Sequence, residues 1–137
     1  MQMRLEIVTA ERVVLSEDVD QINVPTKDGR IGVLPRHETL LTILDVGEMT
    51  IIKGKERIPY ALSGGFMEVL PTRVTILADT VERADEIDEA RAEKARNRAA
   101  QLLREKMSEQ DMVRAEAELR RAMVRLRVAQ LQKTRRK

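Results

Sequence analysis

The chain has 137 residues, with 25 Lys and Arg against 23 Asp and Glu, and a formal net charge of +2. It contains no Cys, which excludes a disulfide framework and a thiolate metal site. One Tyr, one Phe and no Trp argue against a base-stacking nucleic-acid platform, and no apolar run approaches the roughly 20 residues that span a bilayer.

A strand-like alternation begins directly after Met1, so we expect no signal peptide and a soluble protein that does not insert into a membrane. The composition then changes along the chain. Residues 1–80 carry 9 basic and 12 acidic side chains, whereas residues 81–137 carry 16 and 11. All 6 Gly and all 4 Pro lie in the first part. These shifts predict two domains, residues 1–84 and residues 85–137.

Short apolar alternations separated by turn residues predict a β-sandwich in the first domain. Lys53-Gly54-Lys55 and Ser63-Gly64-Gly65 are expected turns. With nine or ten short strands, the predicted fold class is α+β: an N-terminal ten-stranded β-sandwich followed by a C-terminal two-helix antiparallel hairpin. The clearest expected strands lie at residues 3–7, 21–24, 31–33, 40–44, 49–51, 58–62, 66–70 and 74–78.

No catalytic motif is visible in this half. His37 is the only His of the chain, and no Ser or Cys nucleophile motif accompanies it. No glycine-rich phosphate loop of either common type occurs. We therefore interpret the β half as a docking module without catalytic residues and without a metal site.

From about Asp85 the hydrophobic period changes from two to about three and a half, which predicts helices. The first helix is expected to begin at Asp85 or Ala84 and to run through Lys106. Ser108 is the expected N-cap of the second helix. The expected apolar positions are Ile87, Ala95, Ala99, Leu102 and Leu103 in the first helix, and Met112, Ala115, Leu119, Ala122, Leu126 and Ala129 in the second.

The second helix ends in a strongly basic segment, because no acidic residue follows Glu118. Composition alone favours a solvated face with basic charge at the helix C-terminus, where the helix dipole favours it. The alternative is a surface that binds an acidic partner or an anion. The basic residues are Arg120, Arg121, Arg125, Arg127, Lys133, Arg135, Arg136 and Lys137.

Several charged residues of the two helices have spacings that place them on one face. Asp88 and Arg91 are three apart, Arg91 and Arg98 seven apart, and Arg121 and Arg125 four apart. In a closed hairpin the four guanidinium groups would repel one another unless an anion, for example a triphosphate, lay between them. The alternative is that Asp88 and Arg91 form an ordinary surface ion pair, and that these faces contact only water.

Three segments then carry a resemblance: residues 33–41 (VLPRHETLL), 61–69 (ALSGGFMEV) and 74–78 (VTILA), followed by the charged hairpin. Together, and over its whole length, the chain resembles the epsilon subunit of bacterial F-type ATP synthase. The resemblance implies a non-catalytic part of the rotor's central stalk. It also implies a peripheral position at the cytoplasmic face of the bacterial cell membrane, as part of F1.

The partners implied by the resemblance are the gamma subunit, the c-ring and the alpha/beta catalytic head. The sandwich would bind gamma and rest on the c-ring, with Arg36, His37 and Glu38 as candidate contacts. The helices would alternate between a compact hairpin and an extended arm that inhibits ATP hydrolysis, with basic residues such as Arg127 meeting acidic residues of the beta subunit. A stand-alone adaptor, with a basic arm for nucleic acid or a membrane surface, is the alternative of another class.

Some members of this family bind ATP through a motif of the form (Ile/Leu)-Asp-x-x-Arg-Ala, which residues 87–92 (IDEARA) match. The resemblance thus implies no required cofactor but ATP as a regulatory ligand, with the Mg²⁺ requirement open. In this chain Glu89 adds an acid beside Asp88, which would weaken phosphate binding. An arm controlled by other inputs, without ATP, is the alternative. The implied ATP-binding residues are Glu82, Ile87, Asp88, Arg91, Ala92, Arg98, Arg121 and Arg125.

Overall fold

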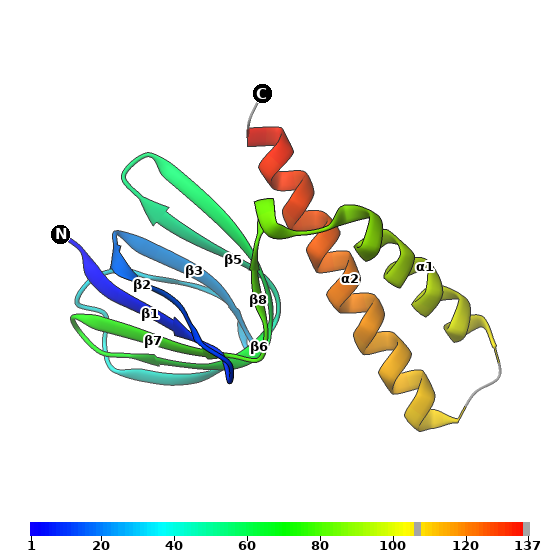
Figure 1. Ribbon diagram of the computed structural model, residues 1–137. Coiled ribbons are helices and arrows are strands. Elements are labelled where there is room, and N and C mark those ends of the chain that lie inside the picture. The colour runs from blue at the N-terminus through cyan, green and yellow to red at the C-terminus, as the bar shows by residue number, and fades with distance from the viewer. Residues whose placement is uncertain (106–107, 136–137) are drawn as a thin grey trace.

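In the computed structural model a β-sandwich is followed by a helical hairpin, which confirms the predicted fold class (Figure 1). The structure describes residues 1–105 and 108–135. The strands are β1 (Met3–Val8), β2 (Val13–Val19), β3 (Gln21–Thr26), β4 (Gly29–Val33), β5 (Leu40–Lys53), β6 (Glu56–Val69), β7 (Arg73–Ala78) and β8 (Val81–Arg83). The 3₁₀ turn η1 (Ala84–Glu86), α1 (Glu89–Arg104) and α2 (Glu109–Arg135) follow.

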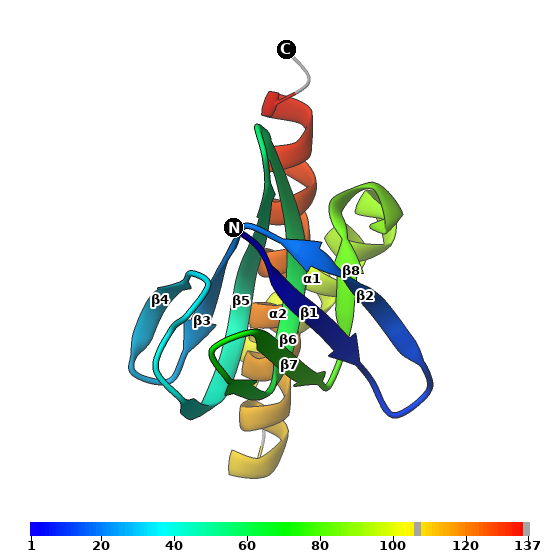
Figure 2. The ribbon, with the colours of Figure 1, turned by 90° about the vertical axis from the view of Figure 1, so that its left-hand side faces the viewer.

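The strands form one continuous sheet that folds over into the two layers of the sandwich. Its order is β2-β1-β7-β6-β5-β3-β4, and β8 pairs with β6. The strands β5 and β6, each of 14 residues, belong to both layers, because β6 pairs first with β8 and then with β7. Figure 2 shows the sandwich in front and α2 passing behind β5 and β6, the two strands that it mainly packs against.

The described part of the chain has eight strands and not the ten that we predicted. The segments expected at 40–44 and 49–51 are one strand, β5, and those expected at 58–62 and 66–70 are one strand, β6. The turn predicted at Ser63-Gly64-Gly65 is wrong. Gly64 and Gly65 have φ angles of +107° and +138°, which bend β6 while its pairing continues.

The strong alternation in the sequence produces the core of the sandwich. In β6, Met67 and Val69 are fully buried, while Phe66 and Glu68 between and beside them are exposed. Each large apolar side chain that is fully buried contributes about 1.5–3 kcal/mol. The largest of these are Leu5, Ile7, Ile22, Met49, Ile51, Leu62, Met67 and Ile76.

The start of α1 lies later than we predicted. Residues 84–86 form η1, Ile87 is extended, and α1 begins at Glu89. Asp88 is its N-cap, and one of its carboxylate oxygens accepts a hydrogen bond from the Arg91 backbone N–H at 3.1 Å. Ile87 lies outside the helix because it packs in a cluster between the sandwich and α2, together with Ala61, Ala84, Val128 and Ala129.

The other end of the hairpin follows the prediction more closely. Ser108 caps α2, since its Oγ accepts a hydrogen bond from the Asp111 N–H at 3.2 Å, and this confirms the predicted N-cap. The helix α1 ends at Arg104. The predicted end at Lys106 lies outside the described residues, as do Arg136 and Lys137 of the predicted basic segment.

Alanines line the contact between the two helices. Ala92 and Ala99 of α1 are fully buried, and Ala115 and Ala122 of α2 are 2% and 3% exposed. Their small side chains allow the helix axes to approach closely. Our seam prediction is confirmed at Ala99, Ala115 and Ala122 but omitted Ala92. Neither of the described helices is long and apolar enough to cross a membrane.

Candidate functional site

The contact between β8 and α2 holds the most buried ion pair outside the core. Arg125 Nη2 donates a hydrogen bond to Glu82 Oε2 at 3.1 Å, and Arg125 Nε lies 2.7 Å from Glu82 Oε1. Both side chains are largely shielded, with 25% and 32% of their surface exposed. The Nε–H is buried and does not align with Oε1 for a hydrogen bond, so the guanidinium retains one unsatisfied donor.

Arg121, one turn before Arg125 on α2, lines the same small cavity beside this ion pair. Ser63 and Thr80 complete its polar wall, and their hydroxyl oxygens lie 2.5 Å apart. The cavity has a volume of about 40 Å³. Small-molecule sites usually enclose about 300–1,000 Å³. A nucleotide therefore does not fit inside this cavity.

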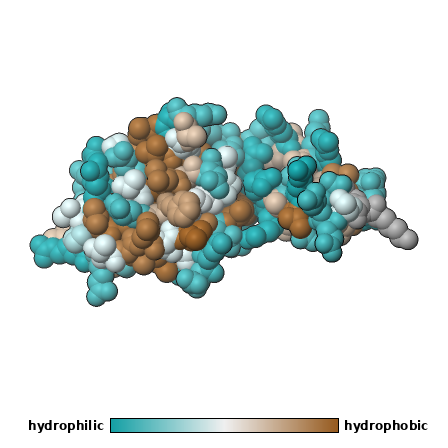
Figure 3. All heavy atoms as spheres, turned by 90° about the horizontal axis from the view of Figure 1, so that it is seen from below, coloured by the Kyte–Doolittle hydropathy of each residue, from teal (hydrophilic) through white to brown (hydrophobic). Residues whose placement is uncertain are grey.

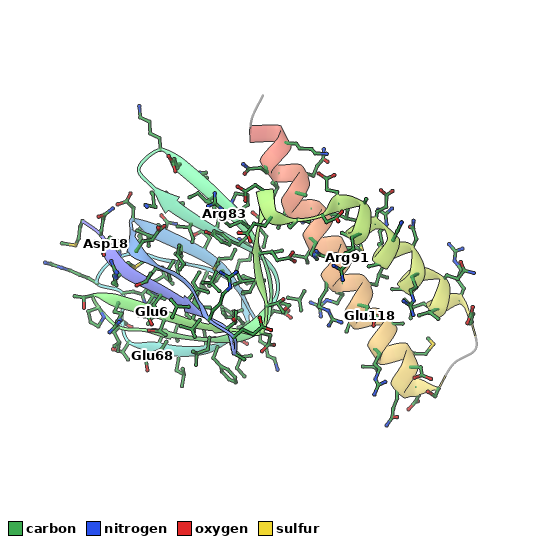
Figure 4. The ribbon with its side chains drawn as sticks, in the orientation of Figure 1. Glu6, Asp18, Glu68, Arg83, Arg91 and Glu118 are labelled. Atoms are coloured by element: carbon green, nitrogen blue, oxygen red, sulfur yellow. The ribbon has the colours of Figure 1, made fainter. Side chains whose placement is uncertain are left out.

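Three of the four predicted arginines have free guanidinium groups. Within residues 1–105 and 108–135, the guanidiniums of Arg91, Arg98 and Arg121 make no ion pair and no hydrogen bond, and all three residues are exposed. Figure 4 labels Arg91 in the first turn of α1. By contrast, four other basic residues of α2 pair with carboxylates of this chain: Arg120 with Asp45, Arg125 with Glu82, Arg127 with Glu48, and Lys133 with Glu89.

The structure thus brings together part of the predicted ATP site. Glu82, Arg121 and Arg125 share one cavity. No hydrogen bond or ion pair connects Arg91 or Arg98 of α1 with these three, as far as the described residues extend. Guanidinium groups do not bond to one another, so the convergence of all four around an anion stays a prediction.

The motif residues 87–92 have structural tasks of their own. Asp88 caps α1, Ile87 anchors the preceding segment, and Ala92 is fully buried in the helix contact. The alternative of a surface ion pair between Asp88 and Arg91 is not found among the described residues, because the Asp88 carboxylate accepts from the Arg91 backbone N–H. Glu89, the additional acid beside Asp88, is paired with Lys133 Nζ at 2.8 Å.

The loop after β4 contains the predicted c-ring contacts. Arg36 has a φ of 65°, and its N–H donates to the Pro71 carbonyl oxygen at 2.7 Å. The His37 N–H donates to the Leu34 carbonyl oxygen at 3.2 Å, and Glu38 is exposed. These bonds tie the loop to the turn before β7 and present Arg36 and Glu38 to the outside.

A second surface feature was not found from the sequence. Ile43, Phe66, Leu77, Val8 and Val13 lie opposite one another in register across β5, β6, β7, β1 and β2. We call this set the outer apolar row. Its exposed members have 41–56% of their surface accessible, and Figure 3 shows apolar residues gathered on this end of the molecule. Phe66, next to the inward Met67, was the available signal: an apolar residue in an outward position.

The pKa of Tyr60, on β6, is shifted by the surroundings of its side chain. Burial raises the pKa of its phenol above the ordinary 10.0, and the positive charge of Arg83, which lies opposite it, acts in the other direction. Glu17, Glu86 and Asp85 raise the pKa further. Tyr60 is therefore neutral at physiological pH and has a packing role.

Comparison with known families covers nearly the whole chain. The profile described as "ATP synthase, Delta/Epsilon chain, beta-sandwich domain" matches residues 2–84. The profile described as "ATP synthase, Delta/Epsilon chain, long alpha-helix domain" matches residues 85–130.

Individual relatives agree with these profiles. The ATP synthase epsilon chain of Chloroflexus aggregans is 70% identical over 137 residues, which are 100% of this chain and 99% of that protein. The epsilon chain of Herpetosiphon aurantiacus is 62% identical over 135 residues, covering 98% and 99%.

Two solved structures share the fold. A chain of the Euglena gracilis mitochondrial ATP synthase, solved with OSCP, F1 and the c-ring, has a TM-score of 0.78 at 27% identity and coverages of 87% and 76%. A chain of the Tetrahymena thermophila mitochondrial ATP synthase central stalk and c-ring has a TM-score of 0.69 at 13% identity and coverages of 94% and 97%. The chain described here therefore belongs to the epsilon-chain family of F-type ATP synthase, whose members are non-catalytic stalk subunits of that complex.

Proposed function

We propose that this chain joins the gamma subunit to the c-ring at the cytoplasmic face of the bacterial membrane, and that its hairpin inhibits ATP hydrolysis unless ATP holds the helices compact. The observation that carries the proposal is the set of unpaired guanidiniums, Arg91, Arg98 and Arg121, together with the part-buried pair of Arg125 with Glu82. Arginine forks suit phosphate oxygens in charge and geometry.

The sandwich offers two surfaces for docking in the stalk. The outer apolar row fits the gamma subunit, because an ordered apolar stripe across five strands is typical of a protein–protein contact. The loop with Arg36, His37 and Glu38 fits the c-ring, since it projects polar side chains from a turn that is tied down by the Pro71 carbonyl.

ATP would act by differential binding. A ligand shifts the equilibrium between two conformations only by as much as it binds one of them better. Phosphates that contact Arg91 and Arg98 on α1 together with Arg121 on α2 bind only when both helices lie side by side. The compact hairpin would therefore gain stability from ATP, and the extended arm would not.

Calorimetric titration of ATP, with and without Mg²⁺, tests the nucleotide part. We expect saturable binding that Arg91→Ala and Arg121→Ala each weaken about tenfold or more, as is usual for charge-assisted hydrogen bonds. Asp88→Asn is preferable to Asp88→Ala, because the amide keeps the N-cap acceptor and removes only the charge. Arg114→Ala is the matched control, since Arg114 is an exposed α2 arginine outside the site.

Absence of binding at millimolar ATP would overturn the nucleotide part and leave an arm that is controlled by other inputs. Inhibition is tested separately in the assembled complex, by its rate of ATP hydrolysis with and without residues 85–137. We expect a higher rate after the deletion. An unchanged rate would remove the inhibitory role, whatever the titration shows.

A further inference from the structure

Two ion pairs join α2 to strand β5, apart from the predicted ATP site. Arg120 Nη2 lies 3.3 Å and 3.4 Å from the two carboxylate oxygens of Asp45. Arg127 Nε lies 3.8 Å from Glu48 Oε2. Arg120 and Arg127 are seven residues apart and so share one face of α2. We call these four residues the β5 clamp.

The pairing of β3 with β5 is irregular at the part of β5 that carries Asp45 and Glu48. Asp45 and Glu48 are three residues apart. In a regular strand their side chains would therefore point to opposite faces of the sheet. However, Asn23 lies opposite Thr50, and Thr26 lies opposite Leu44. Along this stretch β5 advances by six residues while β3 advances by only three. Such a bulge re-aims side chains, and here it allows both carboxylates to meet α2.

The neighbours of this bulge accommodate it. Pro25, within the irregular stretch of β3, has no N–H to leave unpaired. Gly47 lies between the two acids, and its lack of a side chain leaves room for Pro25. A Cβ at position 47 would lie 3.0 Å from the Pro25 ring. The bulge is therefore part of the pairing between β3 and β5, and α2 contacts the two carboxylates that lie in it.

Apolar contact between the hairpin and the sandwich is limited. Its buried residues are Ala61, Ala84, Ile87, Val128 and Ala129, three of which are alanines with little surface to bury. The clamp is partly solvent-exposed, at 59% for Arg120 and 42% for Asp45. Exposed ion pairs weaken as salt is added, because the Debye length falls from about 10 Å at 0.1 M to 3 Å at 1 M.

We infer that the β5 clamp is a salt-sensitive latch that holds α2 against the sandwich. The clamp also occupies the guanidiniums of Arg120 and Arg127 with carboxylates of the same chain. An acidic partner can bind these guanidiniums only after α2 has left the sandwich. The inference rests on the proposed function only in that α2 leaves the sandwich. It involves none of the predicted ATP-binding residues and needs no nucleotide.

Single-molecule energy transfer in the isolated full-length protein tests the latch. Dyes on Lys27→Cys and Gln110→Cys, two exposed sites in a chain without Cys, report the position of the hairpin tip relative to the sandwich. In the absence of ATP we expect one narrow docked population at 50 mM NaCl and a growing second population toward 1 M. The double variant Asp45→Asn with Glu48→Gln should raise the undocked-to-docked ratio about tenfold at 50 mM NaCl, as two weak exposed pairs allow.

Glu6→Gln is the matched control, because it breaks the 2.9 Å pair with Arg73 inside the sandwich and touches no helix. Arg120→Gln should act like Asp45→Asn, and Asp45→Arg combined with Arg120→Asp should restore docking. Equal populations in the wild type and the double variant at every salt concentration would overturn the latch. Failure of ATP to bind, with the salt response intact, would overturn only the nucleotide part of the proposed function.

Discussion

Gly65 occupies the most restricted position among the described glycines. Its φ of +138° is one that side chains rarely adopt, and a Cβ there would lie 2.1 Å from the Leu77 carbonyl oxygen. Gly65→Ala would combine backbone strain with a clash against the neighbouring strand. We expect the free energy of unfolding to fall by about 3 kcal/mol or more, measured by urea denaturation.

Gly54→Ala provides the comparison for this prediction. Gly54 also has a positive φ, of 59°, but a Cβ there meets no atom within 4 Å. Its cost should be limited to the left-handed conformation, about 1 kcal/mol. Equal losses in the two variants would mean that the contact with Leu77 is irrelevant.

Tyr60 should make stability depend on pH in the alkaline range. Because the pKa of its phenol is raised above 10.0 in the folded protein, the neutral form is favoured there relative to the unfolded chain. The contribution is complete below pH 10, and it is lost as the pH rises through the folded pKa. Urea unfolding at pH 9, 10 and 11 should therefore show a steeper decline for the wild type than for Tyr60→Phe, and parallel declines would contradict this assignment.

At the scale of the elements, the alanine seam determines how closely α1 and α2 pack. Ala99 is fully buried against α2, so Ala99→Leu would force three additional carbon atoms into the contact. Overpacking of this kind costs about 1–3 kcal/mol. Ala90→Leu, at an exposed position of the same helix, should leave stability within about 0.5 kcal/mol. Circular dichroism during urea titration would detect the difference, and equal stabilities would argue against a tight seam.

The elements were predictable to the degree that their signals are local. Apolar alternation located β1, β3, β4 and β7, and the change of period located the hairpin. The continuity of β5 and β6 was not predictable, because a glycine pair suits both a turn and a bend, and only the partner strands decide. The acid-rich strand β2 lacks clear alternation and was omitted for that reason. The start of α1 was misplaced because Ile87 follows a tertiary contact rather than helix propensity.

The candidate site shows the same division. Helical spacing already suggested Arg121 and Arg125 as anion ligands, the resemblance implied them together with Glu82, and the fold brings these three together. The part-buried ion pair between Glu82 and Arg125 was not predictable, because the distance along the chain between β8 and α2 gives no information on side-chain pairing. The role of the site in ATP binding stays a prediction.

At the scale of the whole molecule, a substitution in the outer apolar row should weaken association with a partner without lowering stability. Phe66 is 52% exposed, so Phe66→Asp removes little buried surface and should change the unfolding free energy by less than about 1 kcal/mol. It should nevertheless weaken binding to the gamma subunit at least tenfold in a pull-down titration, because a charge would enter an apolar contact. Val113→Asp, at a 64% exposed position on α2, is the control. Unaltered binding by Phe66→Asp would move the gamma contact elsewhere.

The described residues form two separate apolar clusters, a large one inside the sandwich and a small one between the sandwich and α2. Cooperative units of this kind open independently when few contacts join them. Amide protons in the central strands should therefore exchange with solvent only through global unfolding, whereas those of the hairpin exchange through a smaller local opening. If exchange follows this pattern, the sandwich can stay rigid within the stalk while the proposed movement of the helices costs little free energy.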